Sequence, residues 1–276
     1  MTGSRFAERR VRFRKLHTDG CFVIPNPWDA GTAIALAKMG FPALATTSAG
    51  FAFSRGLPDT PEALDVEAVL GHIAEIVNAA DVPVNADFQA GYHRELSGLA
   101  DNIARCVATG VAGLSIEDAY GDNDNPLLSV PEAAERVRVA RSAIDESGED
   151  VLLTARAECF LYGHPDPLAE AIRRLQAYAD AGADVVFAPG VSRREDITAL
   201  VDAVRPVSVN VLISSDSGIT VGELAELGVR RISVGSALSR VAWGAFLSAA
   251  SELANAGTFG GLAQAATFNE LNALFT

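Results

Sequence analysis

Short apolar runs alternate with longer helical patterns along most of this chain. Eight runs, several of them rich in β-branched residues, are each followed by a segment whose apolar residues recur at helical spacing. The runs occupy residues 21–26, 42–50, 82–88, 112–118, 150–158, 183–190, 206–214 and 230–236. One helical pattern at about 5–19 precedes them, and two apolar helical patterns at 238–255 and 261–275 follow them.

This eightfold strand–helix alternation predicts a (β/α)8 barrel, an α/β fold of the TIM-barrel type. Several of the helical patterns end in glycine, as expected where a left-handed residue closes a helix. A doubly wound open sheet is the alternative, but no Gly-x-Gly-x-x-Gly follows the first run. We therefore expect one domain over 1–276, with the barrel at about 20–240 and a C-terminal helical extension at about 238–276.

The C-terminal extension is apolar although it lies beyond the predicted barrel. Its hydrophobic residues need cover, which either the protein's own barrel or a neighbouring subunit can supply. Both arrangements remain open at this point.

Composition and charge narrow the possible functions. The formal net charge is -13, which argues against a nucleic-acid partner, because such proteins present basic surfaces. No stretch of about twenty uncharged apolar residues predicts a membrane span, and the first residues lack an apolar signal core, so we expect a cytoplasmic location. The only lysines are Lys15 and Lys38, and neither follows a predicted strand, which argues against a Schiff-base aldolase.

Charged and polar residues gather where the predicted strands end, which is the edge at which such barrels carry out their chemistry. Carboxylates that converge there repel one another unless they are protonated or bridged by a cation. Because no His or Cys cluster accompanies them, their oxygen ligands suit Mg²⁺ or Mn²⁺, and an arginine among them suits a substrate carboxylate. The residues at these ends are Ser48, Ala49, Gly50, Asp59, Asp87, Gln89, Glu117, Asp118, Arg156, Glu158, Asn210, Ser233 and Gly235.

Other side chains are weaker candidates. His93 and His164 lie in loops on the same side and are possible acids or bases, but packing or solvent contact explains them as well. Cys159 follows the fifth strand, and we expect it to pack rather than react. Glycine-rich segments at 214–218 and 235–237 suggest a third reading, an unrelated phosphate-binding barrel.

Taken together, these segments resemble the isocitrate lyase/phosphoenolpyruvate mutase superfamily over about residues 20–240. The closest resemblance is to the phosphonomutase-like branch, often labelled carboxyvinyl-carboxyphosphonate phosphorylmutase. The segments that carry it are NPWDAGTA (26–33), TTSAG (46–50), GLPD (56–59), ADFQAGY (86–92), GLSIED (113–118), TARAE (154–158), YADAGADVVFAPG (178–190) and ELAELGVRRISVGSA (223–237).

The resemblance implies a role for each matching position. Asp87 would bind Mg²⁺ directly, with Glu117, and Asp59 through water, supporting the metal. Ser48 and the backbone amides of Ala49 and Gly50 would bind the substrate carboxylate and its neighbouring oxygen. Arg156 and Asn210 would also bind substrate, and Ser48, Asp59 and Arg156 form the implied catalytic set. The resemblance further implies a homo-oligomer, a tetramer or dimer, whose terminal helices are exchanged between subunits.

Two departures from the family pattern limit the choice of reaction. Gln89 stands where the pattern has a second acid, which removes one negative charge near the metal. The segment after the fourth strand, AYGDNDNPLLSV, contains no Cys, Lys or His, whereas isocitrate and methylisocitrate lyases carry Lys-[Lys/Arg]-Cys-Gly-His there. The resemblance therefore excludes these two lyase activities.

The implied function is a Mg²⁺-dependent lyase or mutase that acts on a 2-oxo acid. It would break or rearrange a C–C or P–C bond through an enolate of pyruvate. Two alternatives stay open: a catalytically degenerate homologue that only binds a metabolite, and an oxaloacetate decarboxylase-like activity.

Overall fold

The computed structural model describes residues 2–60, 62–120 and 125–276 of the chain. Eight parallel strands form one sheet in the order β1-β8-β7-β6-β5-β4-β3-β2, so the predicted (β/α)8 fold is confirmed. Between β2 and β1, the amide of Ala45 donates to the carbonyl of Pro25 (3.0 Å), which brings the two ends of the sheet together. The strands are β1 (Phe22–Ile24), β2 (Leu44–Ala45), β3 (Val84–Asp87), β4 (Gly113–Glu117), β5 (Leu152–Arg156), β6 (Val185–Phe187), β7 (Ser208–Leu212) and β8 (Arg231–Ser233).

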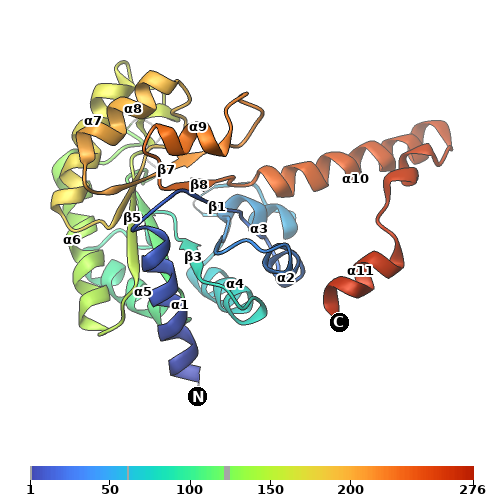
Figure 1. Ribbon diagram of the computed structural model, residues 1–276, viewed down its shortest axis with the longest axis horizontal. Coiled ribbons are helices and arrows are strands. Elements are labelled where there is room, and N and C mark those ends of the chain that lie inside the picture. The colour runs from blue at the N-terminus through green and yellow to red at the C-terminus, as the bar shows by residue number, and fades with distance from the viewer. Residues whose placement is uncertain (1, 61, 121–124) are drawn as a thin grey trace.

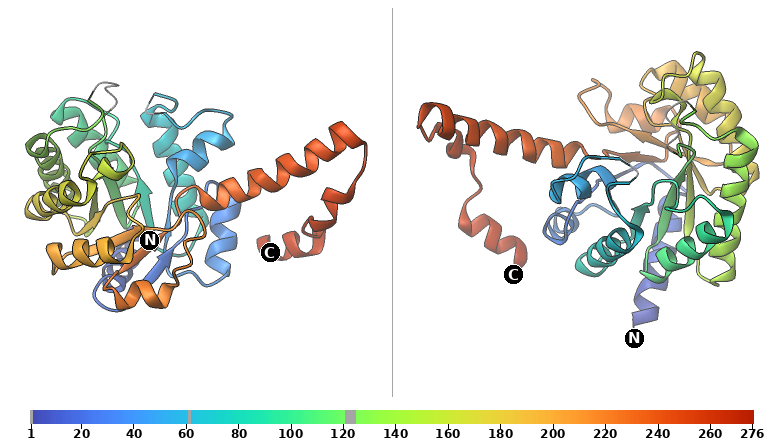
Figure 2. Two further views of the ribbon diagram at one scale, coloured as in Figure 1. Left: turned by 90° about the horizontal axis from the view of Figure 1, so that it is seen from above. Right: turned by 180° about the vertical axis from the view of Figure 1, so that it is seen from behind.

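Helices surround the strands, and one long helix leaves the barrel (Figures 1 and 2). The helices are α1 (Thr2–Leu16), α2 (Ala30–Lys38), α3 (Ser48–Ser54), α4 (Val66–Ala79), α5 (Leu96–Ala108), α6 (Val130–Glu146), α7 (Pro167–Asp180), α8 (Arg194–Val204), α9 (Val221–Glu226), α10 (Ala237–Ala256) and α11 (Phe268–Phe275). Two 3₁₀ helices, η1 (Glu158–Phe160) and η2 (Gly260–Gln264), complete the order.

Three expected boundaries were wrong, each for a local reason. The run 42–50 is not one strand, because the side chain of Thr47 accepts the amide of Gly50 and begins helix α3. The run 150–158 ends at Arg156, and Glu158 opens η1. The expected helix over 261–275 is two short helices, because Thr267 and Glu270 form a capping box that starts α11.

Helix α1 closes the amino-terminal end of the barrel. Phe13 is fully buried and packs with Phe22 and Leu152 inside the ring of strands. Gly113 of β4 makes room for this ring, since a Cβ there would lie 2.7 Å from Phe13 Cε1. The barrel therefore opens only toward the carboxyl ends of its strands, where the predicted functional residues lie.

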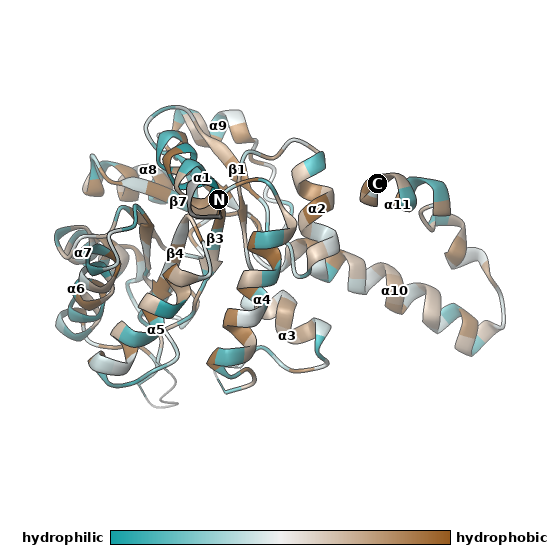
Figure 3. Ribbon diagram, turned by 90° about the horizontal axis from the view of Figure 1, so that it is seen from below, coloured by the Kyte–Doolittle hydropathy of each residue, from teal (hydrophilic) through white to brown (hydrophobic). Residues whose placement is uncertain are grey.

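Helix α10 projects away from the barrel, and α11 returns along it toward α2 (Figure 1). Both helices carry exposed hydrophobic side chains. Their ribbons are partly brown in Figure 3, where brown marks hydrophobic residues. None of the described helices is both long and apolar enough to cross a membrane.

Candidate active site

The carboxyl ends of β3, β4 and β5 bring four charged side chains into one cluster. The guanidinium of Arg156 lies among three carboxylates: Nη1 is 2.7 Å from Asp87 Oδ1 and 3.1 Å from Glu117 Oε2. Its Nε lies 2.9 Å from Glu158 Oε1. The parallel register of the strands brings these side chains together, because Glu117 and Arg156 are paired residues on the adjacent strands β4 and β5. The sequence-based expectation that these residues converge is correct.

The cluster has more negative than positive charge. Burial raises the pKa of Glu117 well above its usual range; Arg156 opposes this, while Glu158 and Asp87 raise it further. Burial likewise raises the pKa of Glu158, although Arg156 lowers it. For Arg156, burial lowers the pKa, but the surrounding carboxylates outweigh it and hold that pKa well above the usual value. An additional cation at this point would relieve the remaining repulsion.

Ser48 holds Asp87 in place in this structure. Both its amide (3.0 Å) and its hydroxyl (2.9 Å) donate to Asp87 Oδ2. Of the two predicted substrate-binding amides, that of Gly50 donates to Thr47 Oγ1 (3.2 Å). Only the amide of Ala49 has no acceptor within the described parts of the chain. The structure therefore leaves Ala49 as the one amide of this group that is free to meet a ligand.

Asp59 lies in the loop after α3, beside the cluster. It lines the same cavity as Asp87 and Arg156. Partial burial raises its pKa, the charge of Asp87 raises it further, and Arg156 lowers it. Asp59 therefore lies close enough to Asp87 and Arg156 for both charges to act on its carboxylate.

A cavity of about 250 Å³ runs from this cluster into the barrel. Its outer part contains Asp59, Asp87 and Arg156, and its inner part contains Asn85, Asn210 and Arg231. The full polar lining is Asn26, Thr46, Thr47, Ser48, Asp59, Asn85, Asp87, Ser115, Arg156, Asn210, Arg231, Ser233 and Ser236. A small polar ligand fits this volume better than a large one.

Asn210 is buried and already engaged. Its Nδ2 donates to Ser233 Oγ (2.9 Å), and its Oδ1 accepts from Arg231 Nε (2.8 Å). Asn210 therefore holds Arg231, a residue that the sequence analysis did not select. The available signal was the strand alternation, because Arg231 shares its face of β8 with Ser233.

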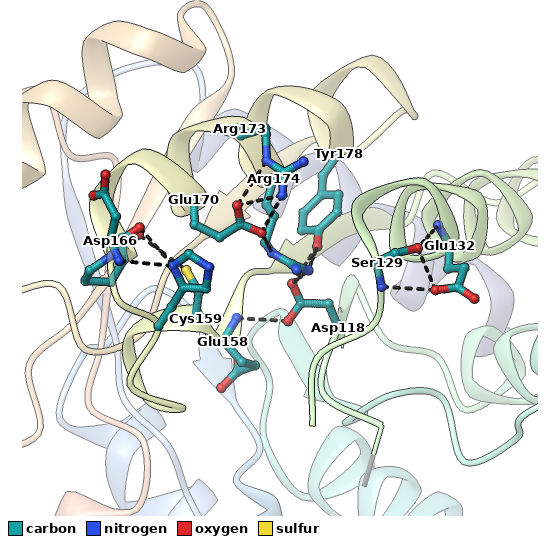
Figure 4. A network of polar contacts seen from close by, with 12 residues as sticks. Asp118, Ser129, Glu132, Glu158, Cys159, Asp166, Glu170, Arg173, Arg174 and Tyr178 are labelled. Carbon is teal, nitrogen blue, oxygen red and sulfur yellow. Dashed lines mark hydrogen bonds and ion pairs between the residues drawn. The ribbon is translucent and has the colours of Figure 1, made fainter. Parts of the chain in front are cut away.

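Asp118 points away from the charged cluster that its neighbour Glu117 joins. Its carboxylate accepts hydrogen bonds from the amide of Glu158 (2.9 Å), from Arg174 Nη1 (2.8 Å) and from the hydroxyl of Tyr178 (Figure 4). The expected role of Asp118 in the site is thus wrong. Successive residues of a strand face opposite sides, so Asp118 joins β4 to helix α7 instead.

Gln89 and Tyr92 adopt left-handed backbone conformations, with φ of 43° and 56°. Such values are costly for residues other than glycine and persist where the surroundings impose them. The carbonyl of Gln89 accepts the amide of Glu117 (2.9 Å), and both residues line a second cavity of about 480 Å³ beside the first. Part of the neighbouring loop, residues 121–124, lies outside the described residues.

The weaker candidates do not line the 250 Å³ cavity. His93 is exposed and His164 is half-buried, and both contact nearby backbone carbonyls. Cys159 is buried, its thiol donates to the carbonyl of Pro167 (3.4 Å), and burial raises its pKa to about 11. Packing is therefore its role, as expected.

The donor set around Asp87 fits a hard, hydrated cation. Within the described residues, no three His, Cys, Asp or Glu side chains are arranged to enclose a metal. Mg²⁺ does not need such a cage, since it keeps several waters and uses one or two carboxylates. Asp87 Oδ2 accepts two hydrogen bonds and Oδ1 accepts one, which leaves a lone pair of Oδ1 available.

Comparison with known proteins identifies the family of this chain. The family profile described as "Phosphoenolpyruvate phosphomutase" matches residues 13–254. The crystal structure of a provisionally assigned lyase/mutase from Burkholderia cenocepacia J2315 superposes with a TM-score of 0.94 at 45% identity, covering 98% of this chain and 97% of that one.

Two curated relatives are also similar. An uncharacterized protein of Mycobacterium tuberculosis (strain H37Rv) is 32% identical over 247 residues, covering 89% of this chain and 88% of the relative. The oxaloacetate decarboxylase of Paraburkholderia xenovorans (strain LB400) is 29% identical over 217 residues, covering 74% and 68%. The chain therefore belongs to the phosphoenolpyruvate phosphomutase family, within the isocitrate lyase/phosphoenolpyruvate mutase superfamily of lyases and phosphonomutases.

Proposed function

We propose that this enzyme is a Mg²⁺- or Mn²⁺-dependent lyase or mutase whose substrate is a 2-oxo acid. The observation that carries the proposal is the position of Asp87, which Ser48 and Arg156 fix at the open end of the cavity with one lone pair to spare. Asp87 would hold the cation, with Glu117 and Asp59 supporting it through water. When bound, the cation supplies positive charge that favours enolisation of a 2-oxo acid.

The protein's own groups would orient the substrate. The Ala49 amide and the Arg156 guanidinium are donors at the outer part of the cavity, where they suit the carboxylate and oxo oxygens of a 2-oxo acid. Negative charge that develops on the oxo oxygen would be stabilised by these preorganised donors. The bond broken next to the enolate is then C–C or P–C.

Isocitrate and methylisocitrate are not among the proposed substrates. The acid/base thiol implied for those lyases has no counterpart here, because none of the chain's three cysteines lines the cavity. An oxaloacetate decarboxylase-like reaction remains the second candidate, supported by the similarity to the Paraburkholderia enzyme. A homologue that binds a metabolite without turnover is the third.

Substitution of Asp87 tests the proposal. Purified protein is assayed for pyruvate release from oxaloacetate, phosphonopyruvate and related 2-oxo acids, with Mg²⁺ and with EDTA. We expect Asp87→Ala to lower metal-dependent turnover by about 10³-fold, as removal of a key electrostatic group does. The matched control is Asp101→Ala, an exposed carboxylate on α5, which should retain wild-type turnover.

Three outcomes separate the candidates. Turnover that survives in Asp87→Ala contradicts the assignment of Asp87. Carbon dioxide release from oxaloacetate alone selects the decarboxylase. Stabilisation by Mg²⁺ and oxalate in a thermal shift assay, without turnover of any 2-oxo acid, identifies a binding homologue.

We also propose that the protein is a homo-oligomer in which the segment from α10 to α11, residues 237–276, contacts a second copy. The support is the hydrophobic surface that this segment exposes, including Phe246, Phe259 and Phe268 at 60%, 71% and 87% exposure. Contiguous surface of this kind marks protein–protein contacts.

A further inference from the structure

The second cavity, of about 480 Å³, lies directly beside the charged cluster. It is bounded by the first turn of α4, the loop after β3 and the end of β4. Glu117 stands between the two cavities, because it lines the second one and its carboxylate contacts Arg156, which lines the first. A ligand held at the cluster can therefore extend into the second cavity.

The walls of this cavity are held in place. Arg136 of α6 donates to three carbonyls of the loop after β3, those of Ala90 (2.6 Å), His93 (2.7 Å) and Arg94 (2.8 Å). Its guanidinium lies 4.9 Å from the ring centre of Tyr120, and the guanidinium of Arg94 lies 4.7 Å from the same ring. Walls that are already ordered are typical of ligand sites, which are usually largely preformed.

The charges around the cavity disfavour an anion. Among the described residues that line it are three acids, Glu62, Asp65 and Glu117, and one arginine, Arg94. Even if Glu117 supports the proposed cation, two acids face one arginine. Like charges placed together weaken binding, so a phosphonate or a carboxylate is a poor occupant.

The rest of the lining is largely apolar. Leu64, Val66 and Ala119 contribute aliphatic side chains, and Tyr92 and Tyr120 add aromatic rings. An apolar cavity of about 150 Å³ is large enough to bind benzene. A volume of about 480 Å³ therefore has room for an uncharged group the size of a ring.

We propose that the second cavity binds the part of the substrate that is released, and that this part is an aldehyde with an uncharged, apolar substituent. The inference rests on the proposed function, which places the carboxylate of the 2-oxo acid at Ala49 and Arg156. A group that leaves C3 without the bonding electron pair is carbon dioxide, a phosphoryl group or a carbonyl compound. Carbon dioxide is too small to need this cavity and a phosphoryl group is anionic, so a carbonyl compound fits best.

The substrate class is then a 4-hydroxy-2-oxo acid with an apolar substituent on C4. Its C3–C4 bond breaks, and the bonding electron pair stays with C3 as the enolate of pyruvate. The 4-hydroxyl group loses its proton to water and becomes the carbonyl oxygen of the aldehyde. A proton from water then adds to C3, so the products are pyruvate and the aldehyde, with no net oxidation or reduction.

Substituted oxamates test this assignment, because the oxamate nitrogen takes the place of C3 in a 2-oxo acid. N-benzyloxamate carries an apolar tail, N-oxalylglycine carries an anionic tail, and oxamate itself has none. Binding of each to the full chain with Mg²⁺ is measured by isothermal titration calorimetry. We expect N-benzyloxamate to bind at least about tenfold more tightly than N-oxalylglycine, because burial of a ring favours the first and like charges disfavour the second.

A charge reversal at the rim supplies the variant. Glu62 is exposed, and Glu62→Arg should raise the affinity for N-oxalylglycine by about threefold or more while that for oxamate stays within about twofold. The matched control is Glu75→Arg, the same change at an exposed position on α4. Glu75 lies roughly 13 Å along the helix from Val66, beyond the screening length of about 8 Å at physiological salt, so this variant should keep all three affinities.

Turnover supplies a readout that depends on no variant. With Mg²⁺, 4-hydroxy-2-oxo-4-phenylbutanoate should give pyruvate and benzaldehyde in equal amounts, and with EDTA it should give neither. Phosphonopyruvate should be turned over more slowly than this compound. Faster turnover of phosphonopyruvate would contradict the assignment of the second cavity to an uncharged group.

The outcomes separate the two proposals. If oxamate does not bind with Mg²⁺, the proposed function fails. If oxamate binds but N-oxalylglycine binds as tightly as N-benzyloxamate, the assignment of the second cavity is wrong. Equal gains for N-oxalylglycine in Glu62→Arg and Glu75→Arg also overturn it, as does a crystal structure that shows the benzyl group in the 250 Å³ cavity.

Discussion

At the scale of single residues, two adjacent acids at the end of β4 have different roles. Glu117 joins the charged cluster through Arg156, whereas Asp118, the next residue, faces α7 and contacts Arg174. Figure 4 shows Asp118 meeting Arg174 and Tyr178 from one side and the backbone of Glu158 from another. Asp118 therefore positions the segment that carries Glu158.

Replacement of Asp118 should mainly affect stability. Asp118→Asn removes the charge opposite buried Arg174, and we expect it to lower the free energy of unfolding by about 3 kcal/mol, since Arg174 keeps only Glu170 as an ionic partner. Urea denaturation measures this. Asp180→Asn, an exposed carboxylate on the same α7, should change stability by less than about 0.5 kcal/mol; equal losses in both variants would contradict the structural role.

The titration of His17 makes the free energy of unfolding depend on pH. Burial, together with the charge of Arg231, lowers its pKa to about 3, whereas the unfolded side chain titrates near pH 6.5. Between these values the unfolded chain binds a proton that the folded chain does not, so the free energy of unfolding falls as pH falls through this window.

The expected size of this effect is about 1–2 kcal/mol between pH 7 and 5. His17→Phe removes the titrating group but keeps a ring beside Phe13 and Phe22. Urea denaturation at both pH values should therefore show a smaller loss in His17→Phe than in wild type. The matched control is His164→Gln, because His164 contacts only the backbone of its own loop in the described parts of the chain.

At the scale of elements, α1 acts as the floor of the barrel. Arg9 and Arg10 anchor it through carbonyls of α4 and α5 and the loop after α5, and Phe13 enters the ring of strands. The predicted amphipathic helix is confirmed, but its position at the closed, amino-terminal end of the barrel depends on residues of β1, β4 and β5, most of which are far away in sequence.

The floor can be tested with two substitutions on α1. Phe13→Ala leaves a cavity among fully buried neighbours, and we expect a loss of about 3–5 kcal/mol in the free energy of unfolding. Val11 on the same helix is 64% exposed, and Val11→Ala should change stability by less than about 0.5 kcal/mol. A small effect of Phe13→Ala would show that the barrel does not depend on this floor.

In the segment before helix α3, one capping residue ends the strand and begins a helix where the sequence pattern predicts a continuous strand. Thr47 caps the helix, and Gly50 fits because a Cβ there would lie 2.6 Å from Thr47 Cγ2 and 3.1 Å from Trp28 Cβ. The segment 46–50 thereby turns at the strand end and presents Ser48 to Asp87. Periodicity over so few residues does not distinguish these conformations.

At the scale of the whole molecule, the segment 237–276 projects from the barrel, and the proposed contact with a second copy lies on it. Phe246→Arg places a charge within the proposed contact with a second copy, and we expect it to shift the protein toward monomer in analytical ultracentrifugation. Val11→Arg introduces the same charge on the exposed face of α1 and should leave the assembly unchanged. A wild-type protein that sediments as a monomer would refute the proposed oligomer.

The sequence by itself determined the barrel and the cluster of Asp87, Glu117 and Arg156. Strand and helix periodicities are local, and parallel strands bring their carboxyl ends to one edge, so alternation along the chain was sufficient. The motifs likewise identified the family.

Only the tertiary structure decided which of the strand-end residues face the cavity and which buried groups are left without partners. Asp118 accepts a hydrogen bond from Arg174, Asp87 accepts one from Ser48, and Arg231 donates to neutral acceptors. The sequence does not reveal these partners, because they lie far apart along the chain. Whether a buried charge is balanced is a property of its three-dimensional surroundings, which no single segment contains.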